Sequence, residues 1–148
     1  MERRQQMNNE LTTTHPALVN YNPGQASLFE MRADSSKFPR LYSMQREVVT
    51  FEMSKIVSQA FLYKGQAADP NNIKFIASAL VTEIFDDRQF SLSSLSLAEI
   101  QVVVKRAVLS EEMFGISVAT LYRAIVEFAK GEGHINQKKV DDLKVKCK

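Results

Sequence analysis

Apolar residues recur at three- and four-residue steps in four segments of this chain, and this spacing restricts the possible fold more than any other feature. The segments are residues 41–63, 70–86, 97–108 and 117–130. Such spacing gathers apolar side chains on one face of a helix, whereas a half-buried strand would alternate them with polar residues. Because strand signals are absent from the sequence, we predict an all-α fold, a small bundle of about four helices.

Residues that cap helices mark the expected boundaries. The starts are Asp69 before Pro70, Ser96 followed three residues later by Glu99, and Ser117. Asp69 can cap a helix, and Pro70 fits the first helical position because it needs no N–H there. Ser96 and Glu99 fit a capping box, in which each side chain bonds the other residue's backbone N–H. The expected ends are the glycines Gly65, Gly131 and Gly133.

The chain is long enough for one domain that folds without disulfides. It has 148 residues, of which 45% are hydrophobic, and Cys147 is its one cysteine. We expect a helical domain at residues 41–134, preceded by an extended or disordered arm at residues 1–40 and followed by a basic tail at residues 135–148.

The arm at residues 1–40 carries short apolar groups separated by Pro16, Pro23 and Pro39. These groups are too small to form a core of their own. Two alternatives remain: the arm packs on its own helical domain, or it docks on a partner. The candidate docking residues are Leu18, Val19, Leu28 and Phe29.

Charge is distributed unevenly along the chain. Residues 41–137 carry nine basic and eleven acidic side chains, whereas residues 138–148 carry five basic and two acidic ones. Contact with phosphate dominates nucleic-acid affinity, so the helical domain lacks the basic excess of a non-specific DNA binder. Lys138 and Lys139 in the tail are candidate phosphate contacts, with a solvated chain end as the alternative.

The last two helices have the outline of a helix-turn-helix. Residues 115–123, Gly-Ile-Ser-x-x-Thr-Leu-x-Arg, resemble the turn and recognition helix of many bacterial helix-turn-helix regulators. The resemblance implies DNA contacts from Ser117, Thr120 and Arg123, and Lys105 and Arg106 lie on the outer face of the preceding helix. The same pair of helices could instead only close the core.

A second resemblance covers roughly residues 70–130. The order of Asn-Asn-Ile-x-x-Ile-Ala at residues 71–77, Leu-Ala-Glu-Ile at 97–100, Phe-Gly at 114–115 and an apolar helix at 121–128 resembles small helical proteins carried by phages and mobile elements of Bacteroidetes-type bacteria. The resemblance implies a non-enzymatic accessory protein of DNA replication. Its expected partner is a replication protein such as a helicase or an initiator, and direct DNA binding is the alternative.

Motifs for catalysis, metals and nucleotides are missing from the sequence. His15 and His134 have no acidic residue at metal-ligand spacing, and the Gly131 segment lacks the Gly-Lys-Ser/Thr of a phosphate loop. We therefore expect a protein that is not an enzyme and takes no cofactor, metal or small-molecule substrate. With neither a secretory signal nor an apolar membrane span, we expect it in the cytoplasm, without membrane contact.

Overall fold

The computed structural model describes residues 26–110, 113 and 115–146, and within them the fold is all-α. The helices are α3 (Leu28–Ala33), α4 (Arg46–Lys64), α5 (Pro70–Asp86), α6 (Leu97–Leu109), α7 (Val118–Phe128) and α8 (His134–Lys146). Short 3-10 turns occupy Leu41–Ser43 and Leu92–Ser94, and a π-helical turn occupies Ala129–Gly133. Strand pairing in this part of the chain is limited to one isolated bridge between Arg40 and Ser96.

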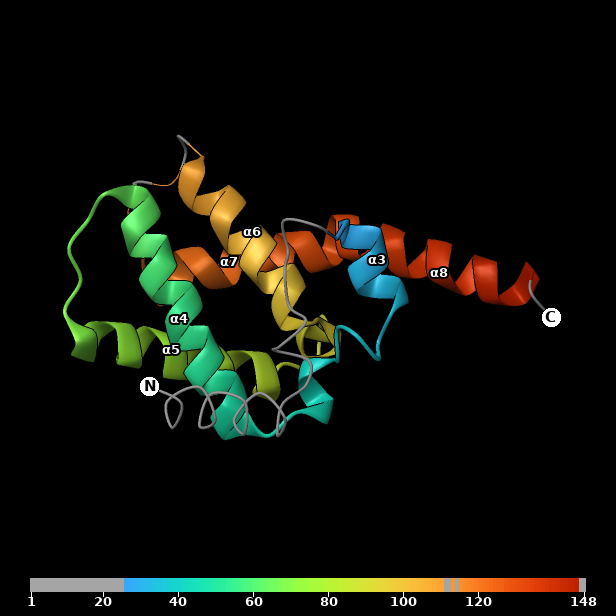
Figure 1. Cartoon of the computed structure of the whole chain (residues 1–148), viewed down its shortest axis with the longest axis horizontal. Coiled ribbons are helices and arrows are strands. Elements are labelled where there is room, and N and C mark those ends of the chain that lie inside the picture. The colour runs from blue at the N-terminus through green and yellow to red at the C-terminus, as the bar shows by residue number, and fades with distance from the viewer. Residues whose placement is uncertain (1–25, 111–112, 114, 147–148) are drawn as a thin grey trace, which may run out of the picture.

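Helices α4 to α7 enclose the main hydrophobic core. Helix α4 packs on α5 and α6, and α7 closes the arrangement by packing on the same two helices. In Figure 1, α4 and α6 run side by side, α5 crosses α4, and α7 crosses α6. Each helix contributes fully buried side chains, among them Met53, Leu80, Ile100 and Leu121. This confirms the bundle predicted from the periodic apolar residues.

Three of the predicted caps are present in the structure. The Asp69 carboxylate accepts a hydrogen bond from the backbone N–H of Asn71, and Ser96 forms the capping box with Glu99. Ser117 caps α7. Gly65 ends α4 with φ +70°, a conformation that strains any side-chain-bearing residue.

The first long helix begins later than expected. We predicted a helix over residues 41–63, but α4 begins at Arg46. The reason lies in the backbone of residues 40–41, which pairs with the segment before α6: the N–H of Leu41 donates to the carbonyl of Leu95 at 2.9 Å. That pairing commits Leu41 to the turn before α4.

Residues 26–40 are packed on the bundle, which differs from the extended arm that we expected for residues 1–40. They contain α3 and a second apolar cluster, in which Met31 and Phe38 bury Ala98 of α6. Ser27 caps α3 by accepting a hydrogen bond from the N–H of Glu30 at 3.1 Å. Residues 1–25, including the candidate docking residues Leu18 and Val19, lie outside the described residues.

The expected basic tail also differs, because residues 134–146 form helix α8. Gly131 and Gly133 do not end α7. Instead, the chain stays helical through the π-helical turn, and Figure 1 shows α8 extending away from the bundle toward the C-terminus. A Cβ at Gly133 would lie 3.2 Å from the carbonyl oxygen of Phe128, so the absence of a side chain permits this tight passage.

One buried ion cluster, formed by Arg32, Arg40 and Glu99, joins α3 to α6. The Arg32 guanidinium makes two bonds to the Glu99 carboxylate, with Nε 3.2 Å from Oε2 and a second bond from Nη2 to Oε1. Both side chains are almost wholly buried. Burial, and then the neighbouring Arg32 charge, lower the pKa of Arg40, whose Nη1 lies 3.9 Å from Glu99.

We predict that Arg32→Met lowers the free energy of unfolding by about 3–5 kcal/mol, because it leaves the Glu99 carboxylate buried without its main partner. The double variant Arg32→Met with Glu99→Met should lose less, since no unpaired charge remains. Urea unfolding measures both effects.

Arg46→Met is the matched control, because Arg46 is exposed, where it bonds Thr82 and lies 5.5 Å from the centre of the Phe85 ring. Its effect should stay within about 1 kcal/mol. A loss for Arg32→Met no larger than that of Arg46→Met would contradict the role given to the buried ion cluster.

Candidate functional site

The buried ion cluster also fixes the position of α8. Arg32 Nη1 donates to Oε1 of Gln137 on α8 at 3.1 Å, and Nη2 donates to the carbonyl of Ser94 at 2.9 Å. Arg32 therefore contacts the segment before α6, α6 itself and α8. Because Phe29 precedes Arg32 by one helical turn, this contact also sets where Phe29 meets α8.

Glu99 is held from the other side by the start of its own helix. Its Oε1 accepts hydrogen bonds from the backbone N–H and from the hydroxyl of Ser96, each at 3.0 Å. Arg40 completes the cluster by donating to the carbonyls of Met31, at 3.1 Å, and of Arg32. All buried side-chain nitrogen and oxygen atoms in the described part of the chain have a hydrogen-bond partner. A fully bonded cluster of this kind holds α3, α6 and α8 in fixed positions.

A groove of about 330 Å³ lies between α3 and α8, and we call it the α3–α8 groove. Its lining is Phe29, Lys139, Asp142, Leu143 and Lys146. The four residues from α8 follow the spacing i, i+3, i+4 and i+7, which places them on one helix face. Phe29 is half-buried, and Leu143 remains 49% exposed, so the floor of the groove is apolar and open to solvent.

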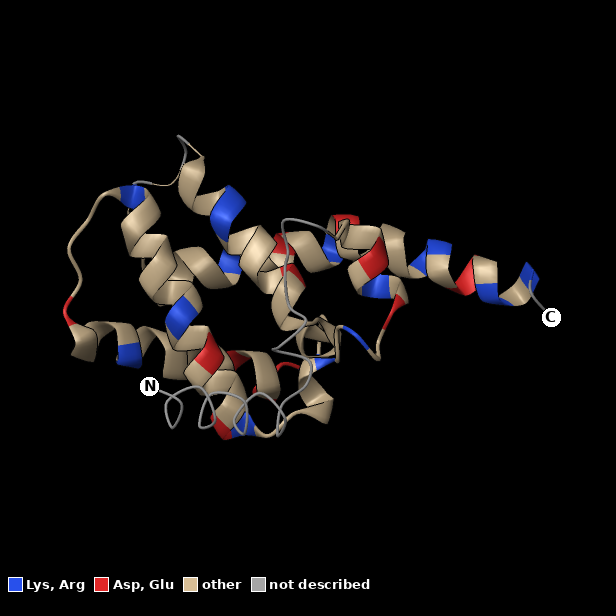
Figure 2. Ribbon diagram, in the orientation of Figure 1, with Lys and Arg blue, Asp and Glu red and all other residues tan. Residues whose placement is uncertain are grey.

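Two exposed lysines of α8, Lys139 and Lys146, line this groove, and no carboxylate of a described residue forms an ion pair with them. Lys138, Lys139, Lys144 and Lys146 are exposed, and the ion pairs found among the described residues involve none of them. Figure 2 shows blue segments along α8 with red among them. Of the nearby carboxylates, Asp141 accepts a hydrogen bond from Gln137 at 3.0 Å. The exposed side of α8 thus combines apolar groups with four lysines and two aspartates, Asp141 and Asp142.

Of the candidate docking residues in the described part of the chain, Phe29 lines this groove and Leu28 does not. The Leu28 side chain is half-buried and packs against both apolar clusters, so its role is to hold α3 on the bundle. Sequence reasoning missed Asp142, Leu143 and the residues that fix the groove, Arg32 and Gln137. Only the helical spacing of residues 139–146 could have indicated a shared face.

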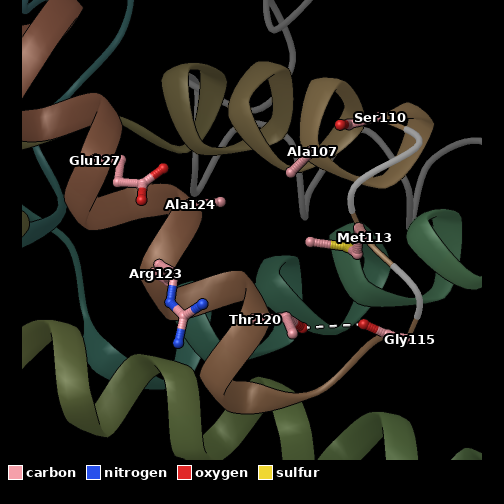
Figure 3. A pocket seen from close by; sticks show the side chains of 8 residues that line it. All are labelled: Ala107, Ser110, Met113, Gly115, Thr120, Arg123, Ala124 and Glu127. Atoms are coloured by element: carbon pink, nitrogen blue, oxygen red, sulfur yellow. Dashed lines mark hydrogen bonds between the residues drawn. The ribbon is translucent and has the colours of Figure 1, made fainter.

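The predicted DNA-contacting residues of α7 lie at the junction between α6 and α7. Ser117 and Thr120 form a reciprocal cap: the Ser117 hydroxyl accepts from the Thr120 N–H at 3.2 Å, and the Thr120 hydroxyl accepts from the Ser117 N–H at 2.9 Å. The Thr120 hydroxyl also bonds the carbonyl of Gly115 at 3.2 Å (Figure 3). Both hydroxyls therefore stabilise the start of α7.

Arg123 is exposed on the next turn of α7 and lines a pocket of about 540 Å³ between α6 and α7. Figure 3 shows it with Glu127, four residues further along the same helix, and with Ala107 of α6. A carboxylate on the face that carries Arg123 offsets its positive charge. This face of α7 thus has no net charge from its two ionised groups.

The remaining basic candidates, Lys105 and Arg106, are exposed on α6 as expected and contact other parts of the protein. The ammonium of Lys105 lies 5.3 Å from the centre of the Tyr63 ring, and Arg106 pairs with Glu132 of the π-helical turn at 3.1 Å. Each of these cations has its own partner, away from the groove formed by Lys139 and Lys146.

Groups of three or more His, Cys, Asp or Glu that could hold a metal ion are absent from the described residues. Among the same residues, no helix is both long and apolar enough to cross a membrane. Comparisons with protein-family models, with curated proteins and with solved structures find no match for this chain.

We predict that Ser117→Ala lowers the free energy of unfolding by about 1 kcal/mol, because the N–H of Thr120 loses its capping partner. The control is Ser78→Ala, an exposed position inside α5, for which we expect a change within about 0.5 kcal/mol. Urea unfolding compares the two. Equal effects would show that the Ser117 hydroxyl does not stabilise α7.

Proposed function

We propose that this protein is a non-enzymatic adaptor that binds another protein through the α3–α8 groove. The observation that carries the proposal is the half-buried Phe29 beside the exposed Leu143, on a surface fixed from below by the buried ion cluster. Aromatic side chains in rigid, partly apolar depressions are the usual centres of protein interfaces. A base that is already ordered reduces the entropy lost on binding.

The expected setting of the adaptor is DNA replication in a phage or mobile element, with a helicase or an initiator as the partner. This part of the proposal rests on the sequence resemblance of residues 70–130. The groove itself lies outside that range, at residues 29 and 139–146, so the setting and the docking site are supported by separate observations.

Direct DNA binding through α7 is the alternative function. The observation in its favour is that Arg123 and Ala119 are exposed on the first turns of α7, where a recognition helix would meet base edges. Glu127 on the same face and the capping role of the Ser117 and Thr120 hydroxyls favour the adaptor instead.

We predict that Phe29→Ser or Leu143→Ser reduces recovery of the partner by more than about tenfold when the full chain is used for affinity capture from its native host. Each change removes an apolar contact from the centre of the interface. Quantitative mass spectrometry of the captured proteins measures the loss.

Phe75→Ser is the matched control, since Phe75 is 66% exposed on α5, away from the groove. Urea unfolding checks that each variant folds. If both groove variants keep the partner that Phe75→Ser keeps, the adaptor proposal is overturned. A separate deletion of residues 1–25 tests Leu18 and Val19, and it must stop there because removing residues 26–40 would also remove Arg32.

For DNA, we expect no retardation of a short duplex by the full chain in about 50 mM salt. Binding by α7 would instead give a complex that weakens steeply toward about 200 mM salt, as phosphate contacts do. A complex that is lost in Arg123→Ala and retained in Lys74→Ala would establish the alternative function.

A further inference from the structure

We propose that the α3–α8 groove binds an acidic, amphipathic helical segment of the partner protein. This inference rests on the adaptor function proposed above and specifies the chemistry of the partner. It follows from the charges around the groove, from their spacing along α8 and from the apolar floor between them.

The spacing of charges on α8 gives the geometry of the partner segment. Lys139 and Lys146 are seven residues apart, two helical turns or about 10.5 Å along the axis. Leu143 lies between them on the same face, opposite Phe29. A partner helix with two acidic residues seven positions apart could place them beside Lys139 and Lys146. A large apolar residue between the two would then contact Leu143 and Phe29.

The two lysines outnumber the single carboxylate of the lining, so the groove carries a net positive charge. Lys139 and Lys146 form no ion pair with a described residue, and Asp142 is the one acidic residue in the lining. Lys138 and Lys144 add positive charge on neighbouring faces of α8. An acidic partner therefore gains electrostatic attraction without having to break existing pairs.

Other occupants fit the groove less well. Residues 1–25 of this chain contain two basic and two acidic side chains, so they supply no excess of negative charge. Nucleic acid or an anionic lipid surface would also pair with Lys139 and Lys146, and binding of either one is an outcome that the test below distinguishes. Nucleic acid would leave the Phe29 and Leu143 side chains without an apolar partner.

Selection from a library of random peptides displayed on phage tests the proposal, with the immobilised full chain as bait. We expect the enriched peptides to be rich in Asp and Glu and to contain an aromatic or large aliphatic residue. Fluorescence anisotropy of the synthesised peptides should show binding that weakens at least about tenfold in Lys139→Glu with Lys146→Glu, because like charges then meet.

Lys74→Glu with Arg88→Glu is the control for total charge, since both cations are exposed and, like the groove lysines, form no ion pair with a described residue. It should retain binding within about twofold. Enrichment of neutral or basic peptides, no enrichment, or equal weakening by both double variants would each overturn the acidic-segment proposal.

A fluorescent duplex and vesicles with anionic lipid serve as further probes, and lysine-dependent binding to either one in place of peptide would also overturn it.

The two proposals fail in different ways. A partner that is captured through Phe29 but whose binding segment is not acidic keeps the adaptor function and overturns its acidic specificity. Loss of the adaptor function requires capture that is insensitive to both Phe29→Ser and Leu143→Ser, whatever peptides the library yields.

Discussion

The placement of α3 and α8 on the helical bundle depends on the bond between Arg32 and Glu99. Taking both charges out of water is costly, and a buried pair persists only when its remaining donors and acceptors are satisfied. Here Ser96 and Arg40 surround the carboxylate, and the Ser94 carbonyl and Gln137 accept from the guanidinium. Since apolar residues of similar volume often replace such a pair without loss of stability, we infer that its main contribution is to fix where α3 lies on α6.

That placement connects the core to the proposed docking site. A six-residue helix such as α3 has no stability of its own, so its position comes entirely from contacts with the rest of the chain. Arg32 holds the inner side of α3 and reaches Gln137 on α8, while Phe29, one turn earlier, meets the outer turns of α8. The groove is thus a consequence of the buried ion cluster, and its charges come from residues that contribute nothing to the core.

The sequence predicted the bundle well because its signals are local. Apolar spacing and the caps at Asp69, Ser96 and Ser117 lie within a few residues of the helices that they define. The ordered state of residues 26–40 depends on a pair 67 residues apart in sequence, which no local pattern reveals. Helix α8 was missed because glycines usually end helices, whereas here a π-helical turn carries the chain through them. Of the site, Phe29 and Lys139 were predicted individually, but their meeting was not.

Hydrogen exchange of the backbone amides of residues 31–34 in the unmodified protein tests the central claim most directly. These amides bond within α3, as in Met31 to the Ser27 carbonyl at 3.0 Å, and a free peptide of this length would exchange them without protection. We expect slow exchange, approaching that of the α4 amides, because the buried ion cluster holds α3 on the bundle. Exchange as fast as in an unstructured peptide would contradict this claim.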